Sequence, residues 1–117
     1  MRGYKILAGF VMSFSLSAFA DNTQQEIDHL IDYVAATECQ YERNGTLHNG
    51  QEAVEHIQKK YNYFKKRIKS AEDFIKYSAS QSTMSRKAYT VHCQGKPTQK
   101  TQDWLLAELA NFRQTTN

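Results

Sequence analysis

The dipeptide Asn44-Gly45, with alternating residues on both sides, constrains the fold of this chain more than any other stretch. Both central residues of a type I′ turn need a positive φ, which Asn and Gly tolerate, so the pair predicts a two-residue β-hairpin. The alternation in residues 39–43 and 46–48 is typical of the two strands. The expected cross-strand pairs are Arg43 with Thr46 and Tyr41 with His48.

The chain has only two cysteines, and both lie in strand-like stretches. Cys39 opens the hairpin, and Cys93 lies in a second alternating run over residues 88–94. In an oxidising compartment such a pair is best interpreted as one disulfide, which would bring the third strand beside the hairpin. Closing a loop of roughly 50 residues would stabilise the fold by ~4 kcal/mol in the chain-entropy model. Two buried free thiols are the alternative.

The first twenty residues have the three parts of a signal peptide. Arg2 and Lys5 form a basic start, residues 6–16 are apolar and uncharged, and residues 17–20 end in an A-x-A cleavage pattern. The apolar run is shorter than the ~20 residues that a membrane span requires. We therefore predict a signal peptide over residues 1–20, with an N-terminal anchor helix as the alternative.

Residues 21–117 are expected to form a single exported α+β domain, periplasmic or secreted, with no stable membrane insertion after signal cleavage. The full chain has a net charge of +3, and removing the predicted signal peptide leaves about +1. Nucleic-acid binding normally requires a strongly basic face, so this weak balance argues against a nucleic-acid partner.

Capping signatures and apolar spacing predict about four helices. We expect them over residues 24–36, over residues 50–69, in a short stretch from residue 71 and from residue 101 onward. The predicted caps are Thr23, Asn49 and Ser70. Together with the hairpin and the 88–94 strand, these helices predict an α+β fold. Its small antiparallel three-stranded sheet would be covered on one face by helices and held by one disulfide.

Several short runs follow one another across the chain: Arg43-Asn-Gly45, Glu52-Ala53 with His56, Lys60-Tyr61, Ser70-Ala-Glu-Asp-Phe-Ile75, residues 82–91 and Trp104-Leu105. In order and spacing they resemble an uncharacterised family of small exported bacterial proteins, known as a domain of unknown function. The family pattern often has an aromatic residue in place of His48, and Gly then Lys-Pro-Tyr in place of Arg86-Lys-Ala-Tyr89. The resemblance implies export and one domain, and it brings no known activity.

Five residues are candidates for binding a ligand or partner: Arg43 and Asn44 at the hairpin tip, His56 and Lys60 near the start of the long helix, and Tyr89. A guanidinium beside a tight turn suits a carboxylate or phosphate, and polar residues in loops on rigid scaffolds are common binding devices. An internal ion pair or helix cap is the alternative role for Arg43. We expect a non-enzymatic binding or interaction module of the periplasm, whose partner is an unknown periplasmic protein or an anionic ligand.

A metal site built from His48, Glu52 and His56 is a weaker hypothesis. Glu52 and His56 are four residues apart and share one helical face, and His48 lies just before that helix. The usual spaced zinc signatures are missing from the sequence, and a hydrogen bond between Glu52 and His56 explains the spacing equally well. We expect no metal and no cofactor.

A small periplasmic enzyme is the main functional alternative. Its site would combine His56, Ser82, Ser85, Lys87 and Tyr89, because a Ser-Lys pair can perform acyl chemistry. A polar loop is the simpler interpretation of the serines. The sequence has no Gly-x-Ser-x-Gly elbow and no His-Glu-x-x-His pair. An inhibitor of an exported hydrolase, which would insert the hairpin tip into a cleft, is a further alternative.

The run from Lys59 to Lys69 holds six Lys or Arg residues and no acid, with Tyr61, Tyr63 and Phe64 interleaved. Such a run can contact anionic lipid headgroups or an acidic partner. A solvated helix face with its aromatic residues in the core is the alternative interpretation.

Overall fold

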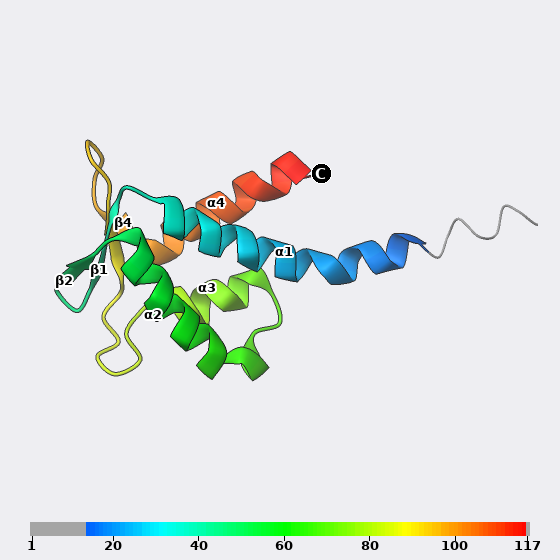
Figure 1. Ribbon diagram of the computed structural model, residues 1–117, viewed down its shortest axis with the longest axis horizontal. Helices are drawn as coiled ribbons and strands as arrows, with labels where there is room; N and C mark the ends of the chain where they lie inside the picture. Colours follow the sequence, from blue (N-terminus) through cyan, green and yellow to red (C-terminus); the bar gives the residue numbers. More distant parts are fainter. Residues whose placement is uncertain (1–13, 117) are drawn as a thin grey trace, which may run out of the picture.

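The computed structural model describes residues 14–116 and places a small sheet at one end of a group of helices (Figure 1). In chain order the elements are α1 (Phe14–Ala36), β1 (Gln40–Arg43), β2 (Thr46–His48), α2 (Gly50–Tyr63), η2 (Lys65–Arg67), α3 (Ala71–Ala79), β3 (Thr90–His92), β4 (Gln99–Lys100) and α4 (Thr101–Thr116). Helices α1 and α3 pack against each other, and both α2 and α4 pack against these two. The α+β class with about four helices is confirmed for the described residues.

The antiparallel sheet has four strands in the order β2-β1-β3-β4, so the prediction of three strands was wrong. The missed strand, β4, is two residues long and pairs Gln99 with Val91 and Lys100 with Thr90. So short a strand has no alternation to detect in the sequence, and α4 begins directly after it. Strand β3 is also shorter than the predicted run over residues 88–94.

The hairpin has the predicted turn and register. Asn44 and Gly45 have φ angles of 50° and 83°, as a type I′ turn requires. The predicted cross-strand pairs, Arg43 with Thr46 and Tyr41 with His48, both form. The predicted disulfide is also present: Cys39 and Cys93 are bonded, with their Cα atoms 4.4 Å apart, beside the paired strands β1 and β3.

The helix caps were predicted better than the helix ends. Asn49 caps α2 through a capping box with Glu52, and Ser70 caps α3, as expected. Helix α1 begins at Phe14 instead of residue 24. No Gly or Pro lies between Phe14 and Thr23, and Thr23 therefore lies inside the helix. The basic start and most of the apolar part of the predicted signal peptide lie outside the described residues.

The long helix also ends earlier than predicted, at Tyr63 in place of Lys69, and a 3₁₀ turn follows. Consecutive Lys65, Lys66 and Arg67 have no acid on the neighbouring helical turns, and like charges three or four residues apart destabilise a helix. Within residues 14–116, no helix is long and apolar enough to cross a membrane.

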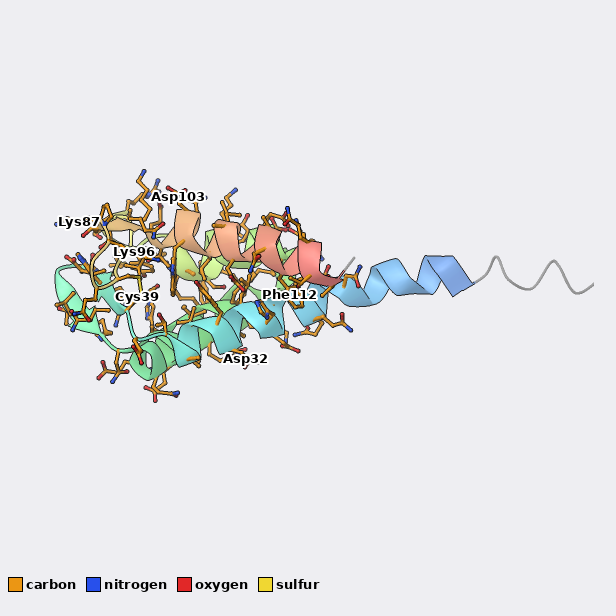
Figure 2. The ribbon with its side chains drawn as sticks, turned by 90° about the horizontal axis from the view of Figure 1, so that it is seen from above. Asp32, Cys39, Lys87, Lys96, Asp103 and Phe112 are labelled. Atoms are coloured by element: carbon orange, nitrogen blue, oxygen red, sulfur yellow. A yellow bond between two sulfur atoms is a disulfide. The ribbon has the colours of Figure 1, made fainter. Side chains whose placement is uncertain are left out.

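The core joins the sheet to the helices. Tyr41 on β1 and Tyr89, which precedes β3, are almost fully buried with their rings 5.5 Å apart. At the far end of the helices, Phe112 of α4 stacks on His29 of α1 at 4.0 Å (Figure 2). Gly50 packs so closely on α1 that an added Cβ would lie 2.4 Å from the carbonyl oxygen of Val34. The start of α2 is thus held close against the end of α1.

Candidate functional site

The hydroxyl of Tyr89 is the meeting point of two predicted binding residues. His56 and Lys60 lie one turn apart on α2 and therefore project from the same helical face. His56 Nε2 lies 3.0 Å from the Tyr89 hydroxyl oxygen, and Lys60 Nζ lies 3.4 Å from it. Lys60 Nζ also donates to the carbonyl oxygen of Gln81 at 2.7 Å. The fold thus brings together three residues that are far apart in the sequence.

Arg43, at the end of β1, adds a second positive charge to this group. Burial, followed by the charge of Arg43, lowers the pKa of both His56 and Lys60. The Nε atom of Arg43 is buried and has no hydrogen-bond partner among the described residues, and the buried hydroxyl of Tyr41 has none either. Buried polar atoms are normally hydrogen-bonded, so the unpaired Nε of Arg43 and the unpaired hydroxyl of Tyr41 both require an explanation.

The charged side chains of this group are all basic. Burial, followed by the charges of Arg43 and Lys60, lowers the pKa of His56 to about 4, so the imidazole is neutral at pH 7. Burial and then Arg43 lower the pKa of Lys60, and burial raises the pKa of Tyr89, whose hydroxyl stays protonated. None of the ion pairs between described residues involves these side chains. We call Arg43, His56, Lys60 and Tyr89 the basic cluster.

The loop over residues 81–88 closes over the hairpin tip. Ser85 Oγ donates to Asn44 Oδ1 at 2.8 Å, so Asn44 is engaged within the fold. An isolated bridge between Gln81 and Ala88 closes the loop, and Arg86 has a φ of 64°. A positive φ at a residue other than Gly is uncommon and stores backbone strain, which concentrates at functional sites.

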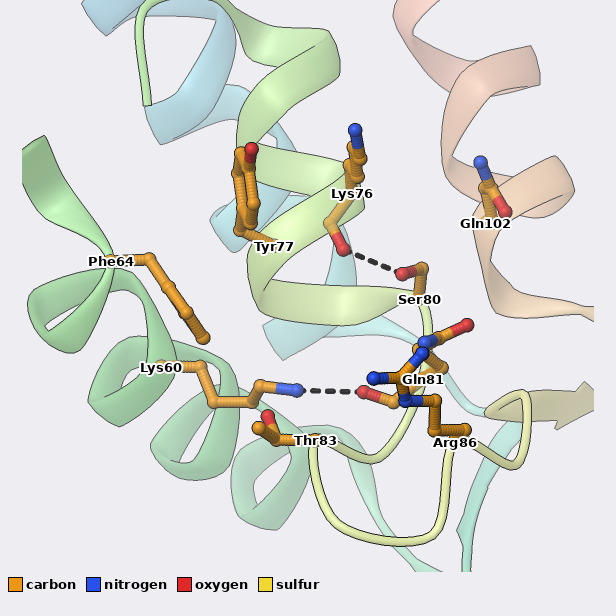
Figure 3. Close-up of a pocket in the computed structure, with 9 residues that line it drawn as sticks. All are labelled: Lys60, Phe64, Lys76, Tyr77, Ser80, Gln81, Thr83, Arg86 and Gln102. Atoms are coloured by element: carbon orange, nitrogen blue, oxygen red, sulfur yellow. Dashed lines mark hydrogen bonds between the residues drawn. The ribbon is translucent and has the colours of Figure 1, made fainter. Parts of the chain in front are cut away.

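A pocket of about 440 Å³ opens between α2, α3 and this loop (Figure 3). Phe64 and Tyr77 stack beside it with ring centroids 5.5 Å apart. The residues that line it are Lys60, Phe64, Lys76, Tyr77, Ser80, Gln81, Thr83, Arg86 and Gln102. Three of these residues are cations and none is an acid. Lys60 belongs both to this pocket and to the basic cluster, so the two positive regions adjoin.

The residues of the enzyme hypothesis are only partly brought together. His56 and Tyr89 meet, as described above. Ser82 is buried and its Oγ accepts the amide hydrogen of Ser85, whose own Oγ accepts that of Lys87. Within the described part of the chain, no hydrogen bond joins either serine to His56. Both serine hydroxyls therefore stabilise the loop by accepting its backbone amide hydrogens, in agreement with the interpretation of this stretch as a polar loop.

The proposed metal ligands also have different partners. Glu52 accepts the amide hydrogen of Asn49 at 3.0 Å and lies 3.7 Å from His48, while His56 faces Tyr89. The alternative expectation, a hydrogen bond between Glu52 and His56, is also wrong, because the imidazole of His56 contacts the Tyr89 hydroxyl instead. Among residues 14–116 no three His, Cys, Asp or Glu side chains are grouped to hold a metal ion.

The sequence interpretation missed Tyr41 and most of the pocket. Tyr41 could have been found, because pairing the hairpin with β3 places it opposite Val91, on the face that carries Tyr89. Lys76, Tyr77 and Arg86 could not, because they come from a helix and a loop whose packing follows no spacing in the sequence.

The fold and the site define a small disulfide-bonded α+β domain with a half-buried basic cluster. Comparison with protein families assigns it further: the model of a family of unknown function, DUF5329, matches residues 21–113. The chain belongs to this family, which confirms the resemblance to a domain of unknown function. No curated protein and no solved structure gives a significant match to the chain.

Proposed function

We propose that this protein is a non-enzymatic binding module of the periplasm, and that its basic cluster recognises a carboxylate or phosphate on an anionic ligand or a partner protein. The observation that carries the proposal is the Nε atom of Arg43, which is buried and unpartnered beside two further basic side chains. Arg presents a planar fork of donors that matches carboxylates and phosphates.

The basic cluster is energetically unfavourable when no anion is bound to it. A buried donor without a partner costs ~1–3 kcal/mol, and the burial of like charges lowers the pKa of both His56 and Lys60. A bound anion would accept from Arg43 and offset the repulsion. Perturbed titratable groups held by a specific charge partner are typical of functional sites.

Three observations support an exported bacterial protein. Residues 1–20 have the signal-peptide pattern, and the family match begins at Asp21, directly after the predicted cleavage site. The Cys39–Cys93 disulfide fits an oxidising compartment.

The two alternatives gain less support. An enzyme at His56, Ser82 and Tyr89 would need a free serine hydroxyl, and that of Ser82 is used within its loop. A hydrolase inhibitor would need a projecting hairpin tip, and Asn44 at that tip is hydrogen-bonded to Ser85.

Titration with inorganic phosphate and with succinate, followed by NMR of the His56 ring, tests the proposal. We expect saturable shifts of the His56 resonances and a rise in its pKa, because a bound anion stabilises the imidazolium. Arg43→Gln should abolish both effects. Lys96→Gln, which removes an exposed cation in the β3–β4 turn, is the matched control and should leave both effects intact.

If neither phosphate nor succinate shifts the His56 resonances, recognition of an anionic group on a partner protein is the remaining part of the proposal. Cross-linking of the protein in intact cells, with Arg43→Gln as the comparison, examines that part. A stoichiometric partner that is retained in Arg43→Gln, or the lack of any captured partner together with silent titrations, would refute a recognition role for the basic cluster.

A further inference from the structure

Two strongly exposed apolar side chains lie at the same end of α2. Among residues 22–116, only Leu47, Tyr63 and Met84 are large apolar side chains with high exposure, at 50%, 81% and 93%. Tyr63 and Thr83, the neighbour of Met84, line one hollow of about 760 Å³. Tyr63 therefore lines a concave surface, and Met84 follows directly in the chain after a residue that lines it. Exposed apolar side chains gathered near one surface mark an interaction site more often than an isolated one does.

The same hollow is strongly basic. Lys65, Lys66 and Arg67 line it, and the chain carries no acid between Glu55 and Glu72. The ion pairs formed by residues of the described range do not involve these three cations. We call Tyr63, Lys65, Lys66, Arg67 and Met84 the basic tip.

The local packing explains why Tyr63 is free to face solvent. Phe64 turns inward and stacks on Tyr77 of α3, with ring centroids 5.5 Å apart. Tyr63 contacts Phe64 edge-on at 4.8 Å and is otherwise exposed. Phe64 thus anchors the end of α2, so the core does not need the ring of Tyr63. Tyr61 is buried and Phe64 packs inward, as the apolar stripe of this run predicts, and Tyr63 is the one of the three rings that faces solvent.

We propose that the basic tip docks peripherally on the surface of an anionic lipid bilayer. Lys and Arg near a membrane surface are attracted to anionic headgroups, and Tyr favours the boundary between headgroups and acyl chains. A charged surface with protruding apolar side chains is the combination that binds interfaces.

The exposed Met84 is the reason to choose a bilayer over a soluble polyanion or an acidic protein patch. A polyanion would neutralise the three cations but would leave the Met84 side chain in water. A bilayer offers phosphates to the cations and an apolar layer to Met84 at the same contact. The proposal uses none of the residues of the basic cluster, so the failure of either idea leaves the other intact.

The test measures where Met84 lies relative to the lipid, using the full chain with its Met and Leu methyl groups labelled for NMR. Vesicles of phosphatidylglycerol and phosphatidylcholine carry a nitroxide lipid whose spin label broadens nearby methyl signals. We expect strong broadening of the Met84 methyl signal and little broadening of the Leu47 methyl signals. Phosphatidylcholine vesicles alone should leave the Met84 signal sharp, which separates docking from any contribution of the apolar N-terminal segment.

The charge dependence is tested with two double variants. Lys66→Gln/Arg67→Gln should lower the bound fraction by roughly tenfold or more, because each cation near an anionic surface contributes substantially to attraction. Lys96→Gln/Lys100→Gln removes two exposed cations from the β3–β4 region and should bind as the parent does. A salt titration should weaken the parent and the control variant alike.

Three outcomes would overturn the proposal. One is equal broadening of the Met84 signal in neutral and anionic vesicles. Another is full retention of binding in Lys66→Gln/Arg67→Gln. The third is a sharp Met84 signal on bound vesicles while soluble polyphosphate shifts the amide signals of Lys66 and Arg67, which would assign the surface to a soluble polyanion.

Discussion

Replacing Arg43 with Met should stabilise the protein while abolishing anion binding. Met is unbranched and flexible enough to occupy the space of the Arg stem, and it has no donor to leave unpaired. The substitution therefore removes the buried, unpartnered Nε atom and one of the positive charges that face His56 and Lys60. Most substitutions destabilise a protein, so a gain in stability would be an unusual and informative result.

The magnitude follows from two opposing effects. An unsatisfied buried donor costs ~1–3 kcal/mol, and its removal recovers part of this amount. Arg43 is only half-buried, so solvent screens much of its repulsion with Lys60 and little further energy is gained there. Some packing of the Arg stem is lost. We expect the free energy of unfolding to rise by about 1 kcal/mol, which raises the Tm of a domain of this size by ~4–8 °C.

Urea denaturation followed by circular dichroism measures the stability, and NMR of the imidazole measures the local electrostatics. The pKa of His56, lowered to about 4 in the parent, should rise in Arg43→Met because the second-largest cause of the shift is gone. It should remain below 6.5, because burial, the largest cause, persists. Arg43→Lys keeps the charge without the Nε donor, so the pKa of His56 should stay near that of the parent.

A loss of more than about 1 kcal/mol in Arg43→Met would refute the reasoning, since it would mean that the guanidinium stabilises the free protein. An unchanged pKa of His56 would refute the electrostatic part separately, because it would show that Arg43 does not act on the imidazole.

Three further predictions concern the residues around the cluster. His56 has a pKa of about 4 in the folded protein and a reference value of 6.5, so the unfolded chain binds more protons between these two pH values. The free energy of unfolding therefore falls as the pH drops from 6.5 to 4. Urea denaturation across this range should show that the unfolding free energy depends less steeply on pH in His56→Gln. Gly50→Ala places a Cβ 2.4 Å from the carbonyl oxygen of Val34, a contact with rigid backbone, and should lower the unfolding free energy by ~1–3 kcal/mol in the same assay. Cys39→Ser/Cys93→Ser opens a loop spanning 54 positions and should cost up to ~4 kcal/mol, measured by thermal unfolding against the oxidised parent.

The parts of the fold that the sequence predicted well are governed by local chemistry. The type I′ turn needs positive φ at Asn44 and Gly45, so it specified both the hairpin and its register. The caps at Asn49 and Ser70 work through side chains that reach amides three residues on. Each of these devices involves residues close together in the chain, which is why a single sequence reveals them.

The parts that were missed depend on packing between distant segments. Strand β4 exists because β3 offers a free edge and the chain returns through a turn at Gly95. The amide hydrogen of Thr101, the first residue of α4, then bonds the carbonyl oxygen of Tyr89 at 2.9 Å. Neither the position of that edge nor the return of the chain can be derived from the two residues of β4.

The sequence predicted which residues belong to the candidate site, but it did not predict how they are arranged. The sequence predicts separate contacts on a hairpin, a helix and a strand: Arg43, His56, Lys60 and Tyr89. The Cys39–Cys93 pair predicted that the third strand lies beside the hairpin, but the sequence did not give the register of β1 on β3 or the packing of α2 against them, on which the convergence depends. It also could not show that Asn44 would bond Ser85 instead of facing solvent.

The disulfide links the stability of this fold to the geometry of the basic cluster. Arg43 ends β1, four residues after Cys39, and Tyr89 precedes β3, four residues before Cys93. The bond therefore joins the two strands at the end of their pairing that is opposite to Arg43 and Tyr89, and it fixes the register that places these two residues across from each other. A half-buried group of like charges tends to push its members apart, and a three-residue strand such as β3 offers few ladder hydrogen bonds to resist this. A covalent link between these strands thus helps to hold together a half-buried group of like charges.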